Sequence, residues 1–476
     1  MHKQKILEYA ITALAFILIF GTHLKFDVSD SDIWLHLASG RVIYETKSIP
    51  KTDVLTFTAF GEPWSLHEWL YQIVNYVMYL KGGMSLLIFI KALTVCLAMG
   101  FLFLLIKKNL YAGIISTIIV SFVLTQFSNV RPHVVSWVFF LLTLLIIKRK
   151  REWILPIMIL IWGNIHPMHL MGLVIIGLYL GERFLVRKDK KYVIITGLSI
   201  IAAMINPLGA GTFSLPFAAV SPYIREWQPF SIRGMYFYIY TAFVAIGAYS
   251  FYKAKKLRVP DAVLFLLLVY MGYTSRRHVA QAFVVLTPLI VNKFKVFDKE
   301  VFKKRDFKKD LVLIVSIVIL IFTGIKTGNA FDTRFPWEMY PINETRIIKE
   351  YDIKGNVFNE YAYGSFLEFE LYPHNLIYID ARAETMGEEL MEEYHSLGAK
   401  RPQDIFKVVK KYNITIVIVE HVMGVGNYLL NSDEWEPIYI DGTRASFVLR
   451  NNETKDVPEF DDTNSPYVKT KTVRTG

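Results

Sequence analysis

The sequence predicts a mostly α-helical protein that crosses a membrane many times and ends in a small α/β domain. The 476-residue chain is 53% hydrophobic and only 20% charged, with a mean hydropathy of +0.34, which argues against a soluble globular protein. Apolar runs recur along its first two thirds, and dense basic clusters lie between many of them. The net charge of +11 therefore indicates membrane loops rather than nucleic-acid binding.

The first apolar run, from about residue 6 to 20, follows the basic stretch HKQK and resembles a signal peptide. No small-x-small cleavage site follows it, so we expect an uncleaved first membrane helix with its N-terminus in the cytoplasm. About eleven spans are expected: 6–24, 83–106, 110–127, 134–147, 153–165, 168–186, 193–206, 236–252, 260–274, 278–293 and 311–325.

The loop charges predict the orientation of these spans. With the N-terminus inside, the clusters KKN, KRKRE, RKDKK and KAKKLR and the Lys-rich stretch 293–310 all fall on the cytoplasmic side. The chain is then expected to be a multi-pass protein of the cell membrane, with the segment 24–82 and the tail after residue 326 on the outer side. The single cysteine, Cys96, lies in an apolar run and allows no intramolecular disulfide.

The first outside loop, residues 24–82, is long, and a loop of this length is usually functional. Together with the spans it is assigned to a membrane domain, residues 1–325. Its stretches DIWLHLASGRVIYE and HEWLYQIVNYVMY are expected to form two amphipathic helices on the membrane surface. Gly82 and Gly83 separate the second helix from the next span. The alternative is one continuous membrane segment.

The tail, residues 326–476, is expected to form the small extracytoplasmic α/β domain. Strand-like runs, NVFN, NLIYID and ITIVIV, alternate with helical stretches at 385–396 and 402–412. Asp380, Arg382 and Glu384 follow one predicted strand. They are expected to form a structural salt bridge, and acceptor binding is the alternative.

Three acidic residues, Asp27, Asp30 and Asp32, open the outside loop in the stretch DVSDSDIWLHLASG. A solvated helix end would explain them without any function. The same loop also carries His36, Glu68 and many aromatic residues, which favours a functional site.

The motifs SDSDIWLHLASG, GEPW, HEWL, WGNIHP and NPLG follow one another in an order that resembles the membrane glycosyltransferases of the GT-C superfamily. In its protein O-mannosyltransferases and lipid A aminoarabinose transferases, the first helix also precedes an outside loop that opens on an acidic motif. The chain lacks the KPPL stretch of the mannosyltransferases. The resemblance implies a GT-C fold.

The resemblance also implies an activity, which is the inverting transfer of a sugar from a polyprenyl-phosphate donor to an acceptor on a lipid, glycan or protein. Asp30 or Asp32 would be the general base. Two carboxylates this close repel each other, which suits proton uptake by one of them. They could instead share a divalent cation, but no third nearby ligand is evident, so no resident metal or cofactor is expected.

Outward-facing cations near the membrane are the candidates for binding the donor phosphate, because Arg suits bidentate phosphate contacts. Anchoring of helix ends among lipid headgroups is the alternative. The stretch WGNIHPMHL is expected to be a broken helix pair that lines the active cavity, or else a plain hairpin turn. The expected substrate-contacting residues are His36, Glu68, Arg131, His133, Asn164, His166, Arg225, Arg276, Arg277 and His278.

A transporter of lipid-linked glycans and a glycan polymerase are the competing classes. A transporter is expected to have internal repeats and charges inside its spans, but no repeat is evident and only Lys91 lies well inside a span. A polymerase would share the outward arginines but would not need the acidic first loop. Nucleic acid is not an expected partner, whereas membrane lipids are.

Overall fold

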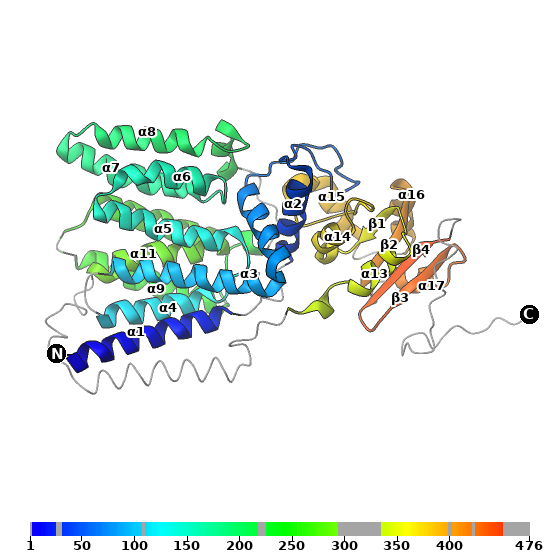
Figure 1. Cartoon of the computed structure of the whole chain (residues 1–476), viewed down its shortest axis with the longest axis horizontal. Helices are drawn as coiled ribbons and strands as arrows, with labels where there is room; N and C mark the ends of the chain where they lie inside the picture. The colour runs from blue at the N-terminus through cyan, green and yellow to red at the C-terminus, as the bar shows by residue number, and fades with distance from the viewer. Residues whose placement is uncertain are drawn as a thin grey trace, which may run out of the picture. The chain divides into compact units, whose positions relative to one another are not determined.

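The computed structural model describes residues 2–24, 31–106, 110–217, 225–254, 256–293, 335–397, 402–420 and 424–450 (Figure 1). The chain forms two compact units, and each is described by itself. The membrane unit comprises Met1–Asp27, His67–Tyr71 and Met78–Phe335. The α/β unit comprises Val28–Leu66, Gln72–Val77 and Pro336–Gly476.

The membrane unit is built from helices that follow the predicted spans. They are α1 (His2–His23), α3 (Trp69–Leu105), α4 (Leu110–Leu124), α5 (Pro132–Arg149), α6 (Leu155–Gly163), α7 (His169–Arg187), α8 (Lys191–Ala203), α9 (Met235–Tyr252), α10 (Val259–Thr274) and α11 (Val279–Lys293). A helix therefore covers each predicted span except 311–325, which lies outside the described residues. By length and hydropathy alone, α3, α5 and α7 are the described helices able to cross a membrane, and several others are apolar but shorter.

Helix α11 lies inside the bundle, where it contacts α4, α5, α9 and α10 (Figure 1). Every residue from 279 to 288 is buried, as expected for a helix surrounded by other helices. Helix α8 instead leaves apolar side chains uncovered, and Val193, Ile194 and Ile201 are each more than half exposed. Apolar residues on an outer helix face are typical of contact with lipid.

The helices bring the basic loops together at one end of the bundle, which we call the basic end. Lys148, at the end of α5, donates from Nζ to the carbonyl oxygens of Leu104 and Leu105, each at 3.0 Å. Further ion pairs at this end are Arg183–Glu152, Arg258–Glu182 and Lys293–Asp261. The alternation of basic and less basic loops therefore corresponds to two chemically different ends of one bundle.

Helix α3 breaks where the sequence predicts it. Gly82 and Gly83 have non-helical backbone angles, and the φ of +60° at Gly83 is one that glycine adopts without steric cost. The helical segment 69–81 is thus distinct from 84–105. The location of 69–81 in the membrane interface stays a prediction.

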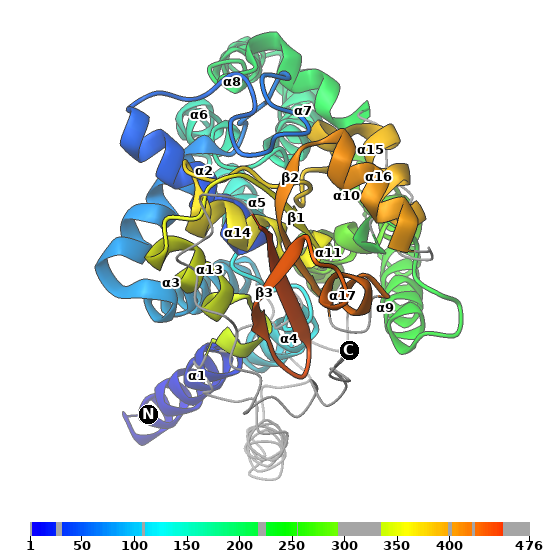
Figure 2. The same ribbon diagram turned by 90° about the vertical axis from the view of Figure 1, so that its right-hand side faces the viewer.

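The α/β unit contains a four-stranded sheet in the order β1-β2-β4-β3 (Figure 1), and Figure 2 shows the same sheet after a quarter turn of the view. Strands β1 and β2 are parallel, and the other neighbours are antiparallel. The strands are β1 (Asn356–Asn359), β2 (Ile414–Glu420), β3 (Trp435–Ile440) and β4 (Arg444–Leu449). The helices that follow Phe335 are α13 (Ile342–Glu350), α14 (Gly364–Leu371), α15 (Ala383–Leu397), α16 (Pro402–Lys411) and α17 (Gly424–Leu430).

The prediction of a strand at NLIYID is wrong. Ile377 forms only isolated bridges, one with Thr56 and one with Val357. The next residue, Tyr378, still donates its backbone N–H to the carbonyl oxygen of Val357 at 2.9 Å. At Ile379 the side chain of Asn359 takes the place of a backbone partner, because its Oδ1 accepts from the Ile379 N–H at 3.4 Å and its Nδ2 donates to the Ile379 carbonyl at 2.8 Å, and the ladder does not continue. The other two predicted strands correspond to β1 and β2, and the two predicted helices to α15 and α16.

Helix α2 (Asp32–Thr46) is a helix as predicted, but within the α/β unit it is mostly buried rather than lying on a surface. Trp34 is fully buried, with ring centroids 4.9 Å from Phe366 and 5.5 Å from Tyr340. A Cβ atom on Gly40 would lie 2.3 Å from the carbonyl oxygen of Gln72, so only glycine allows this close approach. The physical reason is that apolar residues occur around most of the helix. Much of the first outside loop therefore packs with C-terminal residues.

Candidate functional site

Polar side chains gather at the end of the membrane unit opposite to the basic end. They come from the segment before α3, the start of α5, the α6–α7 turn, and the segments before α9 and α11. We call them the polar cluster, which consists of Glu68, Arg131, His133, His166, Glu226 and Arg277. Polar groups gathered at the end of an apolar bundle are typical of a functional site.

Arg131 and Glu226 form an ion pair in this cluster, with Nη1 and Oε2 3.1 Å apart. Partial burial would raise the pKa of Glu226, but Arg131, Arg277 and His133 outweigh it and hold that pKa below its ordinary value. Glu226 is therefore ionised at neutral pH. The guanidinium of Arg277 lies 5.0 Å from the ring centroid of Trp227 and forms no salt bridge in the described part of the chain.

His166 is buried in the α6–α7 turn, and its two ring nitrogens face different groups. Nδ1 lies 2.9 Å from the hydroxyl of Ser136, whereas Nε2 lies 3.7 Å from a carboxylate oxygen of Glu68. The ring of His133 is 6.4 Å away, centroid to centroid. Burial, and then the nearby His133 and Arg277, lower the pKa of His166 well below its usual value, so the imidazole is neutral at pH 7.

Asn164 ties the segment before α3 to the α6–α7 turn. Its side-chain oxygen accepts from the Trp69 indole at 2.7 Å, and its backbone oxygen accepts from the amide of Leu70 at 3.2 Å. Its amide group donates to the carbonyls of Leu160 and Ile205, each at 2.8 Å. Helix α6 ends at Gly163 and α7 begins at His169, which fits both a broken helix pair and a plain hairpin turn. Asn164 thus positions Glu68 by binding Trp69 and Leu70, the two residues that follow Glu68.

The remaining cationic candidates have different surroundings. Arg276 donates from Nε to the carbonyl of Pro229 at 3.1 Å, which fixes the loop before α9. Burial, with Arg277 beside it, lowers the pKa of His278 to about 4. The backbone of Arg225 belongs to a short 3-10 helix, Arg225–Trp227, and its side chain lies outside what the structure describes.

The predicted acidic residue that the structure describes, Asp32, belongs to the α/β unit. Asp32 lies in the first turn of α2 and is partly exposed, and His36 is buried in the same helix of the α/β unit. Asp30 lies outside the described residues. Among the described residues, no three His, Cys, Asp or Glu side chains are arranged to hold a metal ion. Cation sharing between Asp30 and Asp32 therefore stays a prediction.

Sequence reasoning missed Glu226 and Trp227. It considered only cations for phosphate binding, although both residues stand in the same REW stretch as Arg225. His169 also lies close by, because its Nδ1 is 3.1 Å from the backbone oxygen of His166. The sequence could have indicated Glu226 and Trp227, because this carboxylate and indole stand directly beside Arg225, which was already a candidate.

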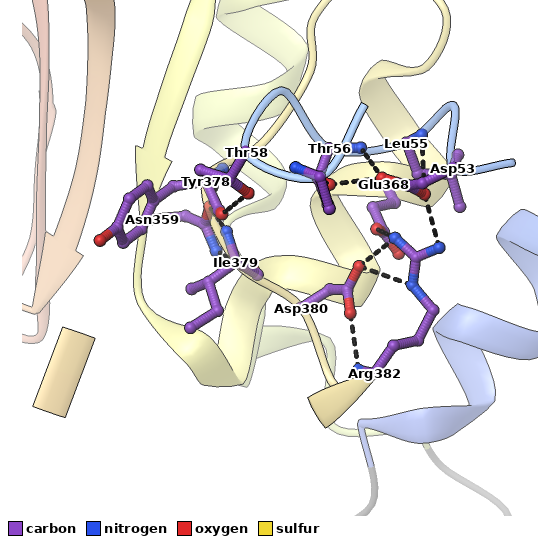
Figure 3. A network of polar contacts seen from close by, with 11 residues as sticks. Asp53, Leu55, Thr56, Thr58, Asn359, Glu368, Tyr378, Ile379, Asp380 and Arg382 are labelled. Carbon is purple, nitrogen blue, oxygen red and sulfur yellow. Dashed lines mark hydrogen bonds and ion pairs between the residues drawn. The ribbon is translucent and has the colours of Figure 1, made fainter. Parts of the chain in front are cut away.

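The α/β unit has its own buried ionic network, centred on Arg382 (Figure 3). Arg382 donates to Asp53 at 2.6 Å, to Asp380 at 2.8 Å and to Glu368 at 3.2 Å. All four side chains are at most 3% exposed, and the guanidinium also lies 4.4 Å from the ring centroid of Trp64. Full burial favours the predicted structural salt bridge. The side chain of Glu384 is outside the described residues.

The carboxylates of this network differ in their pKa values. Burial and the neighbouring Asp380 raise the pKa of Glu368 well above its usual value. Burial would also raise the pKa of Asp380, but Arg382 outweighs it, and the pKa of Asp380 is lowered. The folded protein therefore favours the protonated form of Glu368 and the ionised form of Asp380.

We expect the Glu368→Gln variant to lose less folding stability at high pH than the wild type does. A raised folded-state pKa means that the folded state binds the proton more tightly than the unfolded state. The stabilisation is complete below the ordinary Glu pKa of 4.5 and is lost as the pH rises toward the raised value. Thermal unfolding of the full chain between pH 5 and pH 9 should show a weaker decline in Glu368→Gln. An unchanged decline would contradict the assignment.

No protein-family model matches the chain, and no curated protein matches it in sequence. Solved structures do match. The Archaeoglobus fulgidus oligosaccharyltransferase in its apo form aligns with a TM-score of 0.61 and 13% identity, over 89% of this chain and 70% of that one. ArnT from Cupriavidus metallidurans, bound to undecaprenyl phosphate, aligns with a TM-score of 0.50 and 12% identity, over 94% and 98%.

A third similar structure is the arabinofuranosyltransferase AftD from Mycobacteria, with a TM-score of 0.50 and 10% identity. The alignment covers 94% of this chain but only 40% of AftD. At these identities the likenesses show the fold of this chain. The chain has the GT-C fold, as the sequence resemblance predicts.

Proposed function

We propose that the protein is a membrane glycosyltransferase that transfers a sugar from a polyprenyl-phosphate donor to an acceptor at the outer face of the membrane. The observation that carries this proposal is the polar cluster, in which Arg131 and Arg277 lie with Glu68 and His166 at the non-basic end of an apolar bundle. The similar solved structures include two sugar-transferring enzymes and ArnT bound to undecaprenyl phosphate.

The proposed reaction inverts the configuration at the anomeric carbon of the sugar. The acceptor oxygen attacks that carbon while the bond between the carbon and the phosphate oxygen breaks, and the lipid phosphate leaves with the bonding electrons. Asp32, or alternatively Asp30, takes the acceptor proton. Arg277 and Arg131 bind the departing phosphate, because guanidinium groups form charge-assisted, bidentate contacts with phosphate. The chain needs no covalent intermediate in this scheme.

Replacement of Arg277 by Ala is expected to weaken binding of undecaprenyl phosphate about tenfold or more. Loss of a charge-assisted hydrogen bond removes roughly 1.5–3 kcal/mol, and about 1.4 kcal/mol corresponds to a tenfold change. Arg277 is the strongest candidate because it stacks over Trp227 without a salt bridge to any described carboxylate. Binding can be measured with purified protein and the lipid in detergent.

The neighbouring residue provides the matched control for this prediction. Arg276 is bound to the carbonyl of Pro229 and lies 5.4 Å from the Phe230 ring, so Arg276→Ala should alter the loop more than the phosphate affinity. Normal lipid binding by Arg277→Ala and Arg131→Ala alike would place the phosphate site elsewhere.

A donor screen tests the function itself. Purified protein is incubated with a panel of labelled undecaprenyl-phosphate hexoses and pentoses and a membrane extract as the source of acceptors. Transfer of label from one of these donors supports the proposal. Movement of the intact lipid-linked glycan across the membrane without transfer would indicate a transporter, and extension of a glycan chain from lipid-linked repeat units would indicate a polymerase.

A further inference from the structure

A buried series of polar side chains lies behind Glu68. The indole Nε1 of Trp162 donates to the hydroxyl of Ser136 at 2.8 Å, and that hydroxyl lies 2.9 Å from Nδ1 of His166. Trp162 and Ser136 are fully buried, and His166 is 5% exposed. We call these three residues the relay. Its far nitrogen, Nε2 of His166, faces the carboxylate of Glu68 at 3.7 Å.

The relay determines which nitrogen of His166 carries the proton. An indole N–H can only donate, so the Ser136 oxygen accepts from Trp162 and its own hydrogen is available to donate to Nδ1. The backbone N–H of Met168, which also can only donate, lies 3.4 Å from the same Nδ1. Two donors directed at Nδ1 make it the acceptor. The proton of the neutral imidazole is then on Nε2, the atom that faces Glu68.

The geometry directs a neutral donor at Glu68. Because His166 is buried beside His133 and near Arg277, its pKa is lowered well below its usual value and its imidazole carries no charge at pH 7. The backbone on the other side of Glu68 is fixed by the hydrogen bonds of Trp69 and Leu70 to Asn164. A carboxylate fixed in this way accepts hydrogen bonds and repels anions.

We infer that His166 is a positioning residue, whose Nε2–H holds the Glu68 carboxylate where it accepts hydrogen bonds from hydroxyl groups of the donor's sugar. This inference rests on the proposed glycosyltransferase function. Sugar hydroxyls donate to a carboxylate, whereas the lipid phosphate is repelled by it and matches Arg131 and Arg277 instead. Hydrogen bonds in catalytic sites are often long before substrate binds and tighten in the complex.

Two substitutions of His166 separate positioning from a general structural role. In His166→Gln the side-chain nitrogen reaches the place of Nε2 and still donates toward Glu68. In His166→Asn the polar group stays beside Ser136 but this side chain no longer reaches Glu68. We expect His166→Asn to lower kcat/KM about 10²-fold, the effect of misplacing a group by about 1 Å, and His166→Gln to lose much less. Equal losses, or the reverse order, would overturn the inference.

Binding measurements identify which part of the donor Glu68 contacts. Undecaprenyl phosphate without a sugar should bind to Glu68→Gln and to His166→Asn at least as well as to the wild type. The undecaprenyl-phosphate sugar that the wild type transfers should bind more weakly to both variants. If both lipids bind more weakly to the same extent, Glu68 does not contact the sugar and the inference fails.

A third measurement does not depend on activity. In full-length protein labelled with [¹⁵N]histidine in lipid nanodiscs, the His166 signals are those lost in His166→Asn, and their shifts should show a protonated Nε2 and an unprotonated Nδ1. The opposite tautomer would overturn the relay even if the protein transfers sugar. If the wild type transfers sugar from no donor, the proposed function fails together with the role of Glu68, whereas the tautomer still reports on the relay.

Discussion

Replacement of Asp32 by Asn is expected to slow sugar transfer by about 10²–10⁴-fold, the usual effect of removing a general base. A carboxamide has nearly the size of a carboxylate and still forms hydrogen bonds, so α2 should keep its fold. The carboxamide, however, cannot take up the acceptor proton at neutral pH. Affinity for undecaprenyl phosphate should be unchanged or slightly higher, because a negative charge that repels phosphate has been removed.

The measurement compares turnover at saturating donor with lipid binding in the same preparation. Asp352→Asn is the matched control, because Asp352 is in the same α/β unit and its side chain is 73% exposed. Asp30→Asn is made in parallel, since either carboxylate of the motif is a candidate. Near-normal turnover of both variants would show that the base assignment is wrong, and Glu68 would become the next candidate.

Replacement of Arg382 by Met is expected to lower the free energy of unfolding of the α/β unit by about 3–5 kcal/mol, as is typical when one partner of a buried ionic network is removed. Met fills a similar length of space but leaves Asp53 and Asp380 buried without the guanidinium. Thermal unfolding and limited proteolysis of the full chain, followed at the C-terminal residues, report this loss.

An exposed arginine of the same unit serves as the control. Arg450 pairs with Glu436, but its side chain is 53% exposed, so Arg450→Met should cost no more than about 1 kcal/mol. Adding Asp53→Asn and Asp380→Asn to Arg382→Met should recover part of the lost stability, because the buried charges that lost their partner are then removed. Equal effects of the two arginine variants would contradict the central role of Arg382.

The features that could be predicted from the sequence depend on local patterns. Hydropathy locates the helices of the membrane unit because each span is a continuous apolar run. The break at Gly82 and Gly83 was predictable because two adjacent glycines interrupt a helix. Arg131, His166 and Arg277 were identified because polar residues in short outward loops stand out between apolar runs.

The features that could not be predicted depend on partners far apart in the chain. The burial of helix α2 could not be predicted from its own sequence. Trp34 of this helix is covered by Tyr340 and Phe366, which come from a distant part of the chain. Asp53 looked like an ordinary loop carboxylate, although Arg382 binds it from 329 positions away. Glu226 was missed because its importance comes from Arg131, which belongs to another loop.

The separation between Asp53 and Arg382 also constrains how the protein is made. At a synthesis rate of about 5–20 residues per second, the ribosome needs roughly 16–66 s to add the 329 residues that separate the two partners. During most of this interval the N-terminal loop has neither its ionic partner nor the aromatic residues that cover Trp34. In newly made chains the apolar side chains of α2 therefore stay uncovered until the C-terminal residues have been made. The packing of α2, which carries Asp32, is one of the last steps of biogenesis, and chains truncated before residue 382 cannot complete it.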